Sequence, residues 1–584
     1  MALKRRISRR QAADDDDDGE GDGVDGRLLP AKRHRLASHD LISTLSDELL
    51  VRILAFLDER VLLAISPVSR RFHRITSDSQ LWRPHYYRRF ILPRAHRIPG
   101  FRAGATAAST SRQPSIPADP EWERRRRGFI DAAAAADSSA ALVHQVDWKK
   151  QYKLRHNWAR GRCAVDQVPV HGVDRSPPPE WQTLVKVVEG LAVTADGQTG
   201  LRAWDLKTRK LIAQTSLVAA GDVLVSPTCL AVDDQRLAAG VLDMSAGFHD
   251  GTFGVWRLDV EQSRLTLLFR QTKSYLGHLV AIAYRHPYVL TATSLGFISL
   301  YTFDFSDDDD KHCSDPDATS AESMRSRGMA AEKSTGDALL PAPHQLTSLK
   351  SHSTRLPLAL SLRKTATSVV ASIVYTFDGV GGWAIGIQDL DIRQPAGPSR
   401  PDVVNSRVAY TLPTQTRKSA TPSAESTPAR SPGQVLDSGE NGPIRLCYSH
   451  PYLLATLPDN CMVLHLCTST ATSLTISPGI RLWGHTSGIS DAEITPRGKA
   501  VSVSTRGDEI RLWELEGRVG GSSVEVRPRP PTDGAGDAVD KNLWFPDNTN
   551  VTDRKNWVGF DNEMVVVLKE AEDGRESLVV YDFT

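Results

Sequence analysis

A short strand motif recurs through the C-terminal part of the chain and limits the folds that it can adopt. Its clearest copies, residues 201–206, 253–258 and 510–515, each carry tryptophan at the fourth position. The positions that define all the copies are Trp204, Trp256, Tyr301, Gln388, His465, Trp513 and Tyr581. Where no polar insert intervenes, neighbouring positions lie 52, 45 and 48 residues apart by subtraction. A unit repeated at this period predicts an array of seven similar β-sheets.

The sixth copy belongs to a longer passage that resembles a complete WD repeat. Residues 482–485 read Leu-Trp-Gly-His, as at the head of such a repeat, and Trp513-Glu514 stands where the family has Trp-Asp. A WD repeat of ~40 to 45 residues forms one four-stranded blade. The resemblance therefore implies a seven-bladed, WD-repeat-like β-propeller over residues 161–584.

The resemblance also implies a buried hydrogen-bond network in each strong repeat, made by the Gly-His histidine, a strand Ser or Thr, a turn Asp and the tryptophan. Asp250 and Trp256 fit the turn and tryptophan positions of the second blade. The sixth blade has His485 and Trp513, but Gly507 stands at the turn position. We therefore expect a degenerate propeller.

The ends of the ring and its inserts can also be predicted. The last copy of the motif is a third strand, and the sequence stops three residues after Tyr581, so the seventh blade lacks an outer strand. We expect residues 162–170 to supply that strand, because an unpaired sheet edge is unfavourable. Polar inserts at 307–341, 393–442 and 517–542 are expected to be disordered loops.

A helical region is predicted over residues 39–90. Leu49, Leu50, Ile53, Leu54 and Leu57 recur at helical spacing, and Ser46 precedes them as a potential N-cap. A short second helix over 61–65 should end near Pro67, and a third should begin near residue 68. Three helices this small cannot bury all their apolar side chains, so they need a partner or a neighbouring domain.

This region resembles an F-box, the helical module that joins an F-box protein to the adaptor of an SCF (Skp, cullin, F-box) ubiquitin ligase. The matching order includes Asp47-Glu48-Leu49-Leu50, Phe56-Leu57 and residues 68–72 (Val-Ser-Arg-Arg-Phe). The resemblance implies that the adaptor-binding residues are Leu45, Leu49, Ile53, Leu54, Leu57, Leu62, Val68, Phe72 and Trp82. The chain departs from the F-box family at two positions. Ser46 stands where the family usually has proline, and Phe72 stands where it often has tryptophan. The alternative is an ordinary three-helix core.

Residues 91–160 are predicted to be a linker that contains a helix. Pro120 is a plausible helix start, and Trp148 and Tyr152 share a helical face that should pin the linker helix to whatever follows it. The passage Trp148-Lys149, Tyr152, Arg155, Asn157-Trp158 and Gly161 resembles one that leads into the first propeller strand of F-box proteins with WD-repeat propellers. The arginines at 124–127 point around a helix without interleaved aromatic residues, which favours a solvated surface over nucleic-acid binding.

The chain's charge and its cysteines exclude several classes of protein. A net charge of +1 argues against a protein dominated by nucleic-acid or membrane binding. Its six cysteines form no CxxC pair, which indicates a reducing, intracellular compartment. Residues 1–38 are expected to be a disordered charged tail. Basic clusters at 4–10 and 32–35 are either nuclear import signals or solvating charges, so we expect a location in the nucleus, the cytoplasm or both.

Motifs for catalysis or regulation are weak. The glycines at 379–381 follow a strand, but the following residues continue as strand, where a dinucleotide loop needs a helix. Gly277-His278 and Gly484-His485 fit structural positions at blade heads better than metal or base roles. Ser/Thr-Pro dipeptides at 421, 427 and 431 either are phosphorylation sites or reflect local composition. We expect no cofactor, no metal and no catalytic activity.

Two functions remain open from the sequence. The first is a substrate-recruiting adaptor: the F-box binds a Skp-family subunit, which brings cullin and RING subunits, and the propeller binds an unidentified protein substrate for ubiquitination. The second is a non-degradative scaffold whose propeller organises a protein complex. An enzyme in the propeller channel is disfavoured, since no catalytic constellation fits its structural context.

Overall fold

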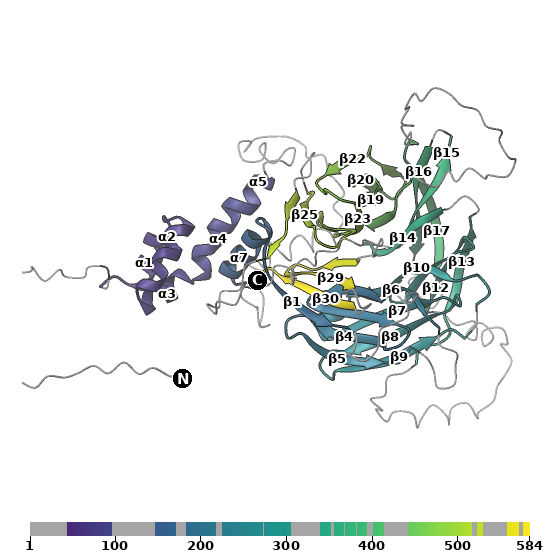
Figure 1. Cartoon of the computed structure of the whole chain (residues 1–584), viewed down its shortest axis with the longest axis horizontal. Coiled ribbons are helices and arrows are strands. Elements are labelled where there is room, and N and C mark those ends of the chain that lie inside the picture. The colour runs from purple at the N-terminus through teal and green to yellow at the C-terminus, as the bar shows by residue number, and fades with distance from the viewer. Residues whose placement is uncertain are drawn as a thin grey trace, which may run out of the picture. The chain divides into compact units, whose positions relative to one another are not determined.

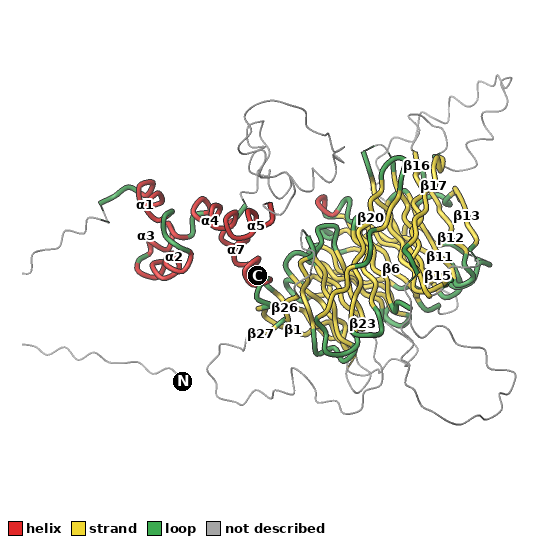
Figure 2. Tube along the Cα trace, turned by 90° about the horizontal axis from the view of Figure 1, so that it is seen from above, coloured by secondary structure: helices red, strands yellow, loops and turns green. Residues whose placement is uncertain are grey.

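The protein is described here by a computed structural model. It describes residues 42, 44–95, 146–170, 183–217, 225–272, 274–304, 339–351, 355–366, 368–380, 382–393, 401–413, 442–516, 523–528, 557–570 and 576–584. The chain divides into two compact units, Met1–Thr76 and Ser77–Thr584. Helices lie in the N-terminal part of the described chain and strands in the C-terminal part (Figure 2).

The first unit contains three short α-helices and a 3₁₀ turn. They are α1 (Asp47–Leu54), α2 (Glu59–Ile65), η1 (Ser66–Val68) and α3 (Arg70–Thr76). The side chain of Ser46 caps α1 by accepting a hydrogen bond from the Leu49 amide at 3.5 Å, as its position predicted. Arg71 Nε donates to Asp47 Oδ1 at 2.9 Å, and Arg74 also pairs with Asp47. These bonds tie α3 to the start of α1.

Four described helices that precede the propeller belong to the second unit, and hereafter they are called the linker helices. They are α4 (Ser79–Tyr86), η2 (Tyr87–Ile91), α5 (Leu92–Ala95) and α7 (Trp148–Trp158). The helix α4 lies within the segment 39–90 assigned to the F-box from the sequence, whereas the boundary between the compact units falls after Thr76. Trp148 contacts Tyr86 with ring centroids 5.3 Å apart, and Tyr152 contacts Trp82 at 5.2 Å. The prediction that Trp148 and Tyr152 pin the linker helix to the part of the chain that follows it is corrected, because both rings pack against α4, which precedes it. The helix predicted near Pro120 and the arginines at 124–127 lie outside the described residues.

Seven antiparallel sheets follow one another along the chain (Figure 1). Blade 1 has β2 (Leu184–Val188), β3 (Leu191–Asp196), β4 (Gly200–Asp205) and β5 (Lys210–Thr215). Blade 2 has β6 (Pro227–Asp233), β7 (Val241–Phe248), β8 (Phe253–Asp259) and β9 (Arg264–Arg270), with the 3₁₀ turn η4 (Leu237–Ala239). Blade 3 has β10 (Leu279–Arg285), β11 (Tyr288–Thr293), β12 (Phe297–Thr302) and β13 (His344–Lys350).

The remaining sheets have the same order of strands. Blade 4 has β14 (Arg355–Lys364), β15 (Val369–Gly379), β16 (Gly382–Arg393) and β17 (Asp402–Tyr410). Blade 5 has β18 (Arg445–Ser449), β19 (Tyr452–Thr456), β20 (Cys461–Ser469), β21 (Leu474–Ile476) and β22 (Ile480–Trp483), the last two both paired to β20. Blade 6 has β23 (Ile489–Ile494), β24 (Lys499–Ser504), β25 (Ile510–Glu514) and β26 (Ser523–Glu525).

Blade 7 is assembled from distant parts of the chain. It has β28 (Trp557–Phe560), β29 (Met564–Glu570) and β30 (Glu576–Asp582), and its outer strand is β1 (Arg162–Pro169). Residues Ala164 to Pro169 pair antiparallel with Asp582 to Ser577. The short β27 (Arg527–Pro528) runs parallel to the start of β1. The prediction that the segment near residues 162–170 completes the last blade is confirmed.

The seven sheets form a closed ring. The first strands of consecutive blades contact one another from β2 round to β28, and β28 contacts β2 again. Apolar clusters fill the interfaces between neighbouring blades, such as the one between blades 1 and 2 that contains Leu201, Met244 and Trp256. All seven positions of the sequence motif lie on third strands, from Trp204 on β4 to Tyr581 on β30. The seven-bladed fold predicted from these positions is confirmed.

Two of the inserts predicted to be disordered contain strands, so their predicted ranges are too long. The segment 393–442 contains β17, which pairs with β16 from Gly386↔Tyr410 to Arg393↔Asp402. The segment 517–542 contains β26 and β27. Outer strands of a blade are largely exposed and therefore polar, as in the DVVNSRVAY of β17, so composition alone does not separate them from loops.

Candidate functional site

An apolar stripe on α1 is exposed rather than buried. Leu49, Ile53 and Phe56 are 48%, 51% and 91% exposed, and their spacing of four and three residues places them along one side of the helix and its following turn. The opposite side is buried at Leu50 and Leu54. The helix therefore has two apolar faces, of which only one is buried by residues that the structure describes.

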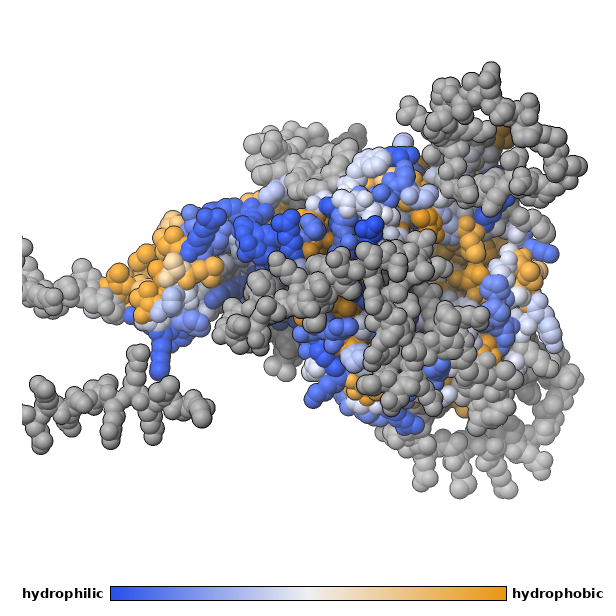
Figure 3. Space-filling view, in the orientation of Figure 1, coloured by the Kyte–Doolittle hydropathy of each residue, from blue (hydrophilic) through white to orange (hydrophobic). Residues whose placement is uncertain are grey.

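The exposed apolar surface continues beyond α1. In the first unit, Ile42, Leu49, Ile53, Phe56, Val61, Leu63 and Val68 are each 43–91% exposed, and hereafter they are called the apolar docking face. Figure 3 shows hydrophobic side chains gathered over α1 and α2. Scattered exposed apolar residues are ordinary, but a run of seven in so small a unit marks an interaction surface.

The predicted adaptor-binding residues separate into two groups. Leu49, Ile53 and Val68 belong to the apolar docking face, and Leu45, Leu57 and Phe72 are half-buried. Three others are buried: Leu54 is 5%, Leu62 is 0% and Trp82 is 2% exposed. The assignment of Leu54 and Leu62 as docking contacts is corrected, because side chains buried within the small helical unit are not available to a partner. Trp82 packs against Tyr152 of α7, which agrees with the expectation that the F-box side chains are buried against either the adaptor or the linker.

The physical reason for the correction is that helical spacing alone does not say which apolar face meets solvent. Leu54 and Leu62 fill the interior of the small helical unit, and Trp82 belongs to the second unit, where its ring contacts Tyr152. Phe56, Val61 and Leu63 were not among the predicted contacts, although Phe56 was part of the sequence resemblance. These residues are apolar but lie among charged residues in or beside short helices. This pattern was the sequence signal that could have identified them as exposed contacts.

One blade contains the buried network that the sequence predicted. In blade 6, His485 Nε2 lies 2.6 Å from Ser502 Oγ, and Trp513 Nε1 donates to the same oxygen at 2.8 Å. Gly507 leaves the turn position without a carboxylate. Glu509 supplies it instead, because its Oε2 lies 3.4 Å from His485 Nδ1. Sequence reasoning missed Glu509 because it stands two residues beyond the expected position.

The other predicted structural residues have more varied surroundings. Trp204 Nε1 donates to Thr194 Oγ1 at 3.0 Å in blade 1. Trp256 is 2% exposed, whereas Asp250 is exposed and accepts hydrogen bonds from the Thr252 amide and hydroxyl. Asp250 therefore caps a turn, and its predicted place in a buried network with Trp256 is corrected.

Aromatic contacts or burial account for the remaining three structural positions. Trp158 stacks on Phe583 with centroids 4.5 Å apart, which ties the end of α7 to the last residues of the chain. Tyr301 packs against Phe253 at 5.5 Å across blades 3 and 2. Tyr581 is buried in β30 beside β1.

The blade 6 histidine makes propeller stability depend on pH. Burial lowers the pKa of His485 from 6.5 to about 4, although the Glu509 carboxylate opposes the shift. The unfolded chain therefore binds a proton below pH 6.5 that the folded chain does not bind until near pH 4. The contribution of neutral His485 to the free energy of unfolding is fully present above pH 6.5 and falls by about 3 kcal/mol as the pH drops to about 4. Burial lowers the pKa of His450 to about 4 as well, so the two histidines lower the stability of the propeller over the same pH range.

We expect the urea midpoint of unfolding to fall between pH 7 and about pH 5, and His485→Gln to reduce that dependence but not to abolish it, because burial also lowers the pKa of His450 and His465. A pH dependence unchanged in His485→Gln would show that other groups control it. A second variant, His450→Gln, should also reduce the dependence, because burial lowers the pKa of His450 over the same pH range.

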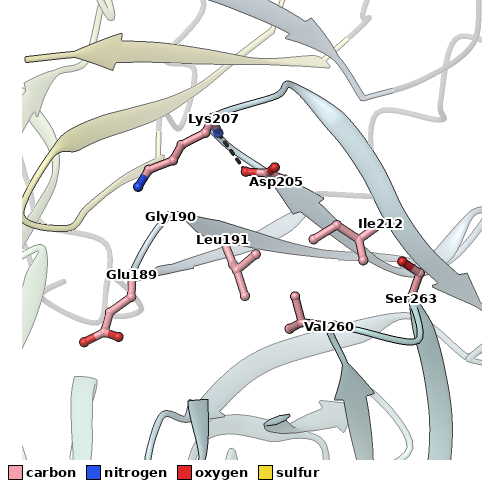
Figure 4. A pocket seen from close by; sticks show the side chains of 8 residues that line it. All are labelled: Glu189, Gly190, Leu191, Asp205, Lys207, Ile212, Val260 and Ser263. Atoms are coloured by element: carbon pink, nitrogen blue, oxygen red, sulfur yellow. Dashed lines mark hydrogen bonds between the residues drawn. The ribbon is translucent and has the colours of Figure 1, made fainter. Parts of the chain in front are cut away.

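A shallow pocket lies between blades 1 and 2 (Figure 4). Its volume is about 340 Å³, and it is lined by Glu189, Gly190, Leu191, Asp205, Lys207, Ile212, Val260 and Ser263. Asp205 Oδ1 accepts from the Lys207 amide at 2.9 Å, and Lys207 Nζ pairs with Glu563 at 3.1 Å. These polar groups cap a turn and form a surface ion pair, so the pocket has no arrangement of nucleophile and base.

The other sequence motifs have structural surroundings. Gly379 pairs with Gly382 at the end of the β15–β16 hairpin, so no helix follows to receive a phosphate. His278 stacks on His249 with centroids 5.1 Å apart. Within the described ranges, no group of three His, Cys, Asp or Glu side chains could hold a metal ion. No helix that the structure describes is long and apolar enough to cross a membrane.

Several sequence predictions concern parts of the chain that the structure does not describe. These are the charged tail 1–38 with its basic clusters and the Ser/Thr-Pro dipeptides at 421, 427 and 431. They stay predictions.

Comparison with known proteins agrees with this architecture. A family model described as F-box-like matches residues 42–88, and a model described as F-box protein pof12 beta-propeller matches residues 163–584. No curated protein matches the chain.

Three solved structures are similar at low identity. The computationally designed Ika8 protein is 12% identical with a TM-score of 0.33, and the match covers 69% of this chain and 83% of that one. U3-55K is 9% identical with a TM-score of 0.36, and the match covers 72% of this chain and 98% of that one. A chain of the Mitotic Checkpoint Complex is 10% identical with a TM-score of 0.35, and the match covers 71% of this chain and 95% of that one. At these TM-scores the similarities carry no argument about fold or function.

Proposed function

The chain belongs to the family of F-box protein pof12 β-propellers, and from this premise we propose that it is the substrate-recruiting subunit of an SCF-type ubiquitin ligase. The apolar docking face would bind a Skp-family adaptor, and the adaptor would bring the cullin and RING subunits. The propeller would hold a protein substrate. The observation that carries the proposal is an exposed apolar surface within the segment that matches the F-box-like model.

The chain would act in this complex by position rather than by chemistry. The described residues contain no constellation of nucleophile, base and oxyanion donors, and the polar groups of the blade 1–2 pocket serve turn and ion-pair roles. A subunit that binds adaptor and substrate together raises the effective concentration of substrate lysines near the charged ubiquitin carrier. This is sufficient for a recruiting role.

The proposal predicts that charges placed in the apolar docking face abolish adaptor binding. In Leu49→Asp/Ile53→Asp, two half-exposed side chains that the partner would bury become carboxylates. Each buried leucine or isoleucine contributes about 1.5–3 kcal/mol, so the dissociation constant should rise at least ~100-fold. Titration calorimetry of the full chain with purified Skp-family adaptor measures it.

The matched control is Leu211→Asp/Leu267→Asp, which alters two leucines that are each 43% exposed on outer propeller strands. It should bind adaptor like the natural chain. Equal binding by both double variants would refute the docking face. If adaptor binds but purified cullin does not join the complex, the chain is a scaffold and not a ligase subunit.

A further inference from the structure

The linker helices concentrate positive charge. Residues 77–92 and 146–162 contain nine Lys and Arg side chains against two Asp, which is a net charge of +7 in 33 residues. The whole chain has 71 basic and 70 acidic side chains. Such a segregation of charge creates a positive potential over one surface of an otherwise balanced protein.

The cations of α7 share one side of that helix. Lys149, Lys153 and His156 recur at four and three residues, and Arg160 follows in the next turn. The other sides of the helix are buried, for example at Leu154 and Trp158, which pack against the propeller. In Figure 3 strongly hydrophilic side chains cover α4 and α7.

Aromatic rings hold several of these cations in place. Lys149 Nζ lies 5.9 Å from the centre of the Trp82 ring and donates to Ser77 Oγ at 3.0 Å. The Arg89 guanidinium lies 5.5 Å from the Tyr152 ring, and that of Arg83 lies 5.7 Å from the Tyr87 ring. Side chains that are already ordered lose less entropy on binding, so this surface is organised for recognition.

Part of this positive charge has no counter-charge among the residues that the structure describes. Two ion pairs in this region join Lys150 to Glu563 at 4.0 Å and Arg155 to Glu514 at 3.9 Å, both on the side that faces the propeller. Among residues that the structure describes, Arg88, Lys153 and Arg160 have no carboxylate within 4.0 Å. Like charges held together without counter-charges destabilise a fold, which a partner of opposite charge would offset.

We propose that the cations Arg83, Arg88, Lys149, Lys153 and Arg160 of these helices form a docking site for an acidic protein segment. Four of the aromatic side chains of these helices are turned inward: Trp82, Tyr86, Trp148 and Tyr152 are 2%, 1%, 7% and 5% exposed. Tyr87 and Phe90 are half-buried, so no ring of the helices is fully exposed for base stacking, which disfavours single-stranded nucleic acid. The inference does not depend on the role of the apolar docking face.

Fluorescence anisotropy of the full chain with a labelled oligoglutamate peptide of about 12 residues tests the proposal. We expect binding at low ionic strength that weakens as salt screens the charges. The triple variant Arg83→Glu/Lys153→Glu/Arg160→Glu should bind at least ~10-fold more weakly, because each reversal replaces attraction by repulsion. The neutral triple with Gln at these positions should be intermediate.

The matched control reverses three exposed cations of the propeller, Lys210→Glu/Arg264→Glu/Arg506→Glu, so net charge changes equally. It should bind within ~2-fold of the natural chain. Equal loss in both triples, or no binding by the natural chain, would overturn the site. Tighter binding to an oligonucleotide or to phosphatidylserine vesicles, lost in the linker triple, would overturn the choice of an acidic protein. Circular dichroism confirms that each variant is folded.

Discussion

A chain that begins at residue 171 should fail to form the propeller, whereas one that begins at Ser77 should form it. The shorter chain lacks β1, so β30 becomes an unpaired edge and blade 7 has three strands. It also loses the buried side chains of Cys163, Val168 and Val170, which are 3%, 6% and 2% exposed. Outer strands of other blades have no such role, because their blades do not close the ring.

The expected loss is large compared with the stability of a domain. Burial of three such side chains contributes about 4–8 kcal/mol, before the six backbone pairs of β1 with β30 are counted. Domains are stable by about 5–15 kcal/mol. The contacts of α7 with the last residues also disappear, including the bond from Asn157 Nδ2 to the Phe583 carbonyl at 2.8 Å.

Limited proteolysis and thermal unfolding of the two chains measure the difference. The chain from Ser77 should give a protected propeller and a cooperative transition, and the chain from residue 171 should give neither. A protected, cooperative core in the shorter chain would mean that the ring closes without β1.

Replacement of Asp389 by alanine should destabilise the propeller by about 3–5 kcal/mol. Asp389 lies on β16 and is 0% exposed. It accepts hydrogen bonds from Ser372 Oγ at 2.7 Å and from Ser469 Oγ at 2.6 Å, and Arg363 pairs with it at 3.2 Å. Ser469 belongs to blade 5, so this carboxylate joins neighbouring blades.

Removal of the carboxylate leaves the Arg363 side chain, which is 17% exposed, without its ion-pair partner. Loss of one partner of a buried pair is costly for this reason. Urea unfolding compares Asp389→Ala with Asp378→Ala, which breaks an exposed pair in the same blade, Arg355–Asp378, and should cost less than about 1 kcal/mol. Similar losses for the two variants would contradict the proposed importance of burial.

Much of the architecture could be predicted because its signals are local. The motif around Trp204 and Trp513 marks third strands wherever it occurs, and counting it yielded seven blades without any knowledge of contacts. The cap at Ser46 and the break at Pro67 likewise depend on residues a few positions away. The outer strand β17 escaped prediction, since an exposed strand carries little of the alternation that identifies strands.

The sequence by itself determined the order of helices and blades, the F-box resemblance and the identity of the strand that closes the ring. Only the tertiary structure decided which apolar residues are available to a partner: Leu49 and Leu54 share one helix, yet one is 48% and the other 5% exposed. It also decided that Glu509 replaces the missing turn carboxylate and that α4 packs its aromatic side chains against α7. Periodicity and composition report neighbours along the chain, whereas exposure and ion pairing depend on residues that folding brings together from distant positions.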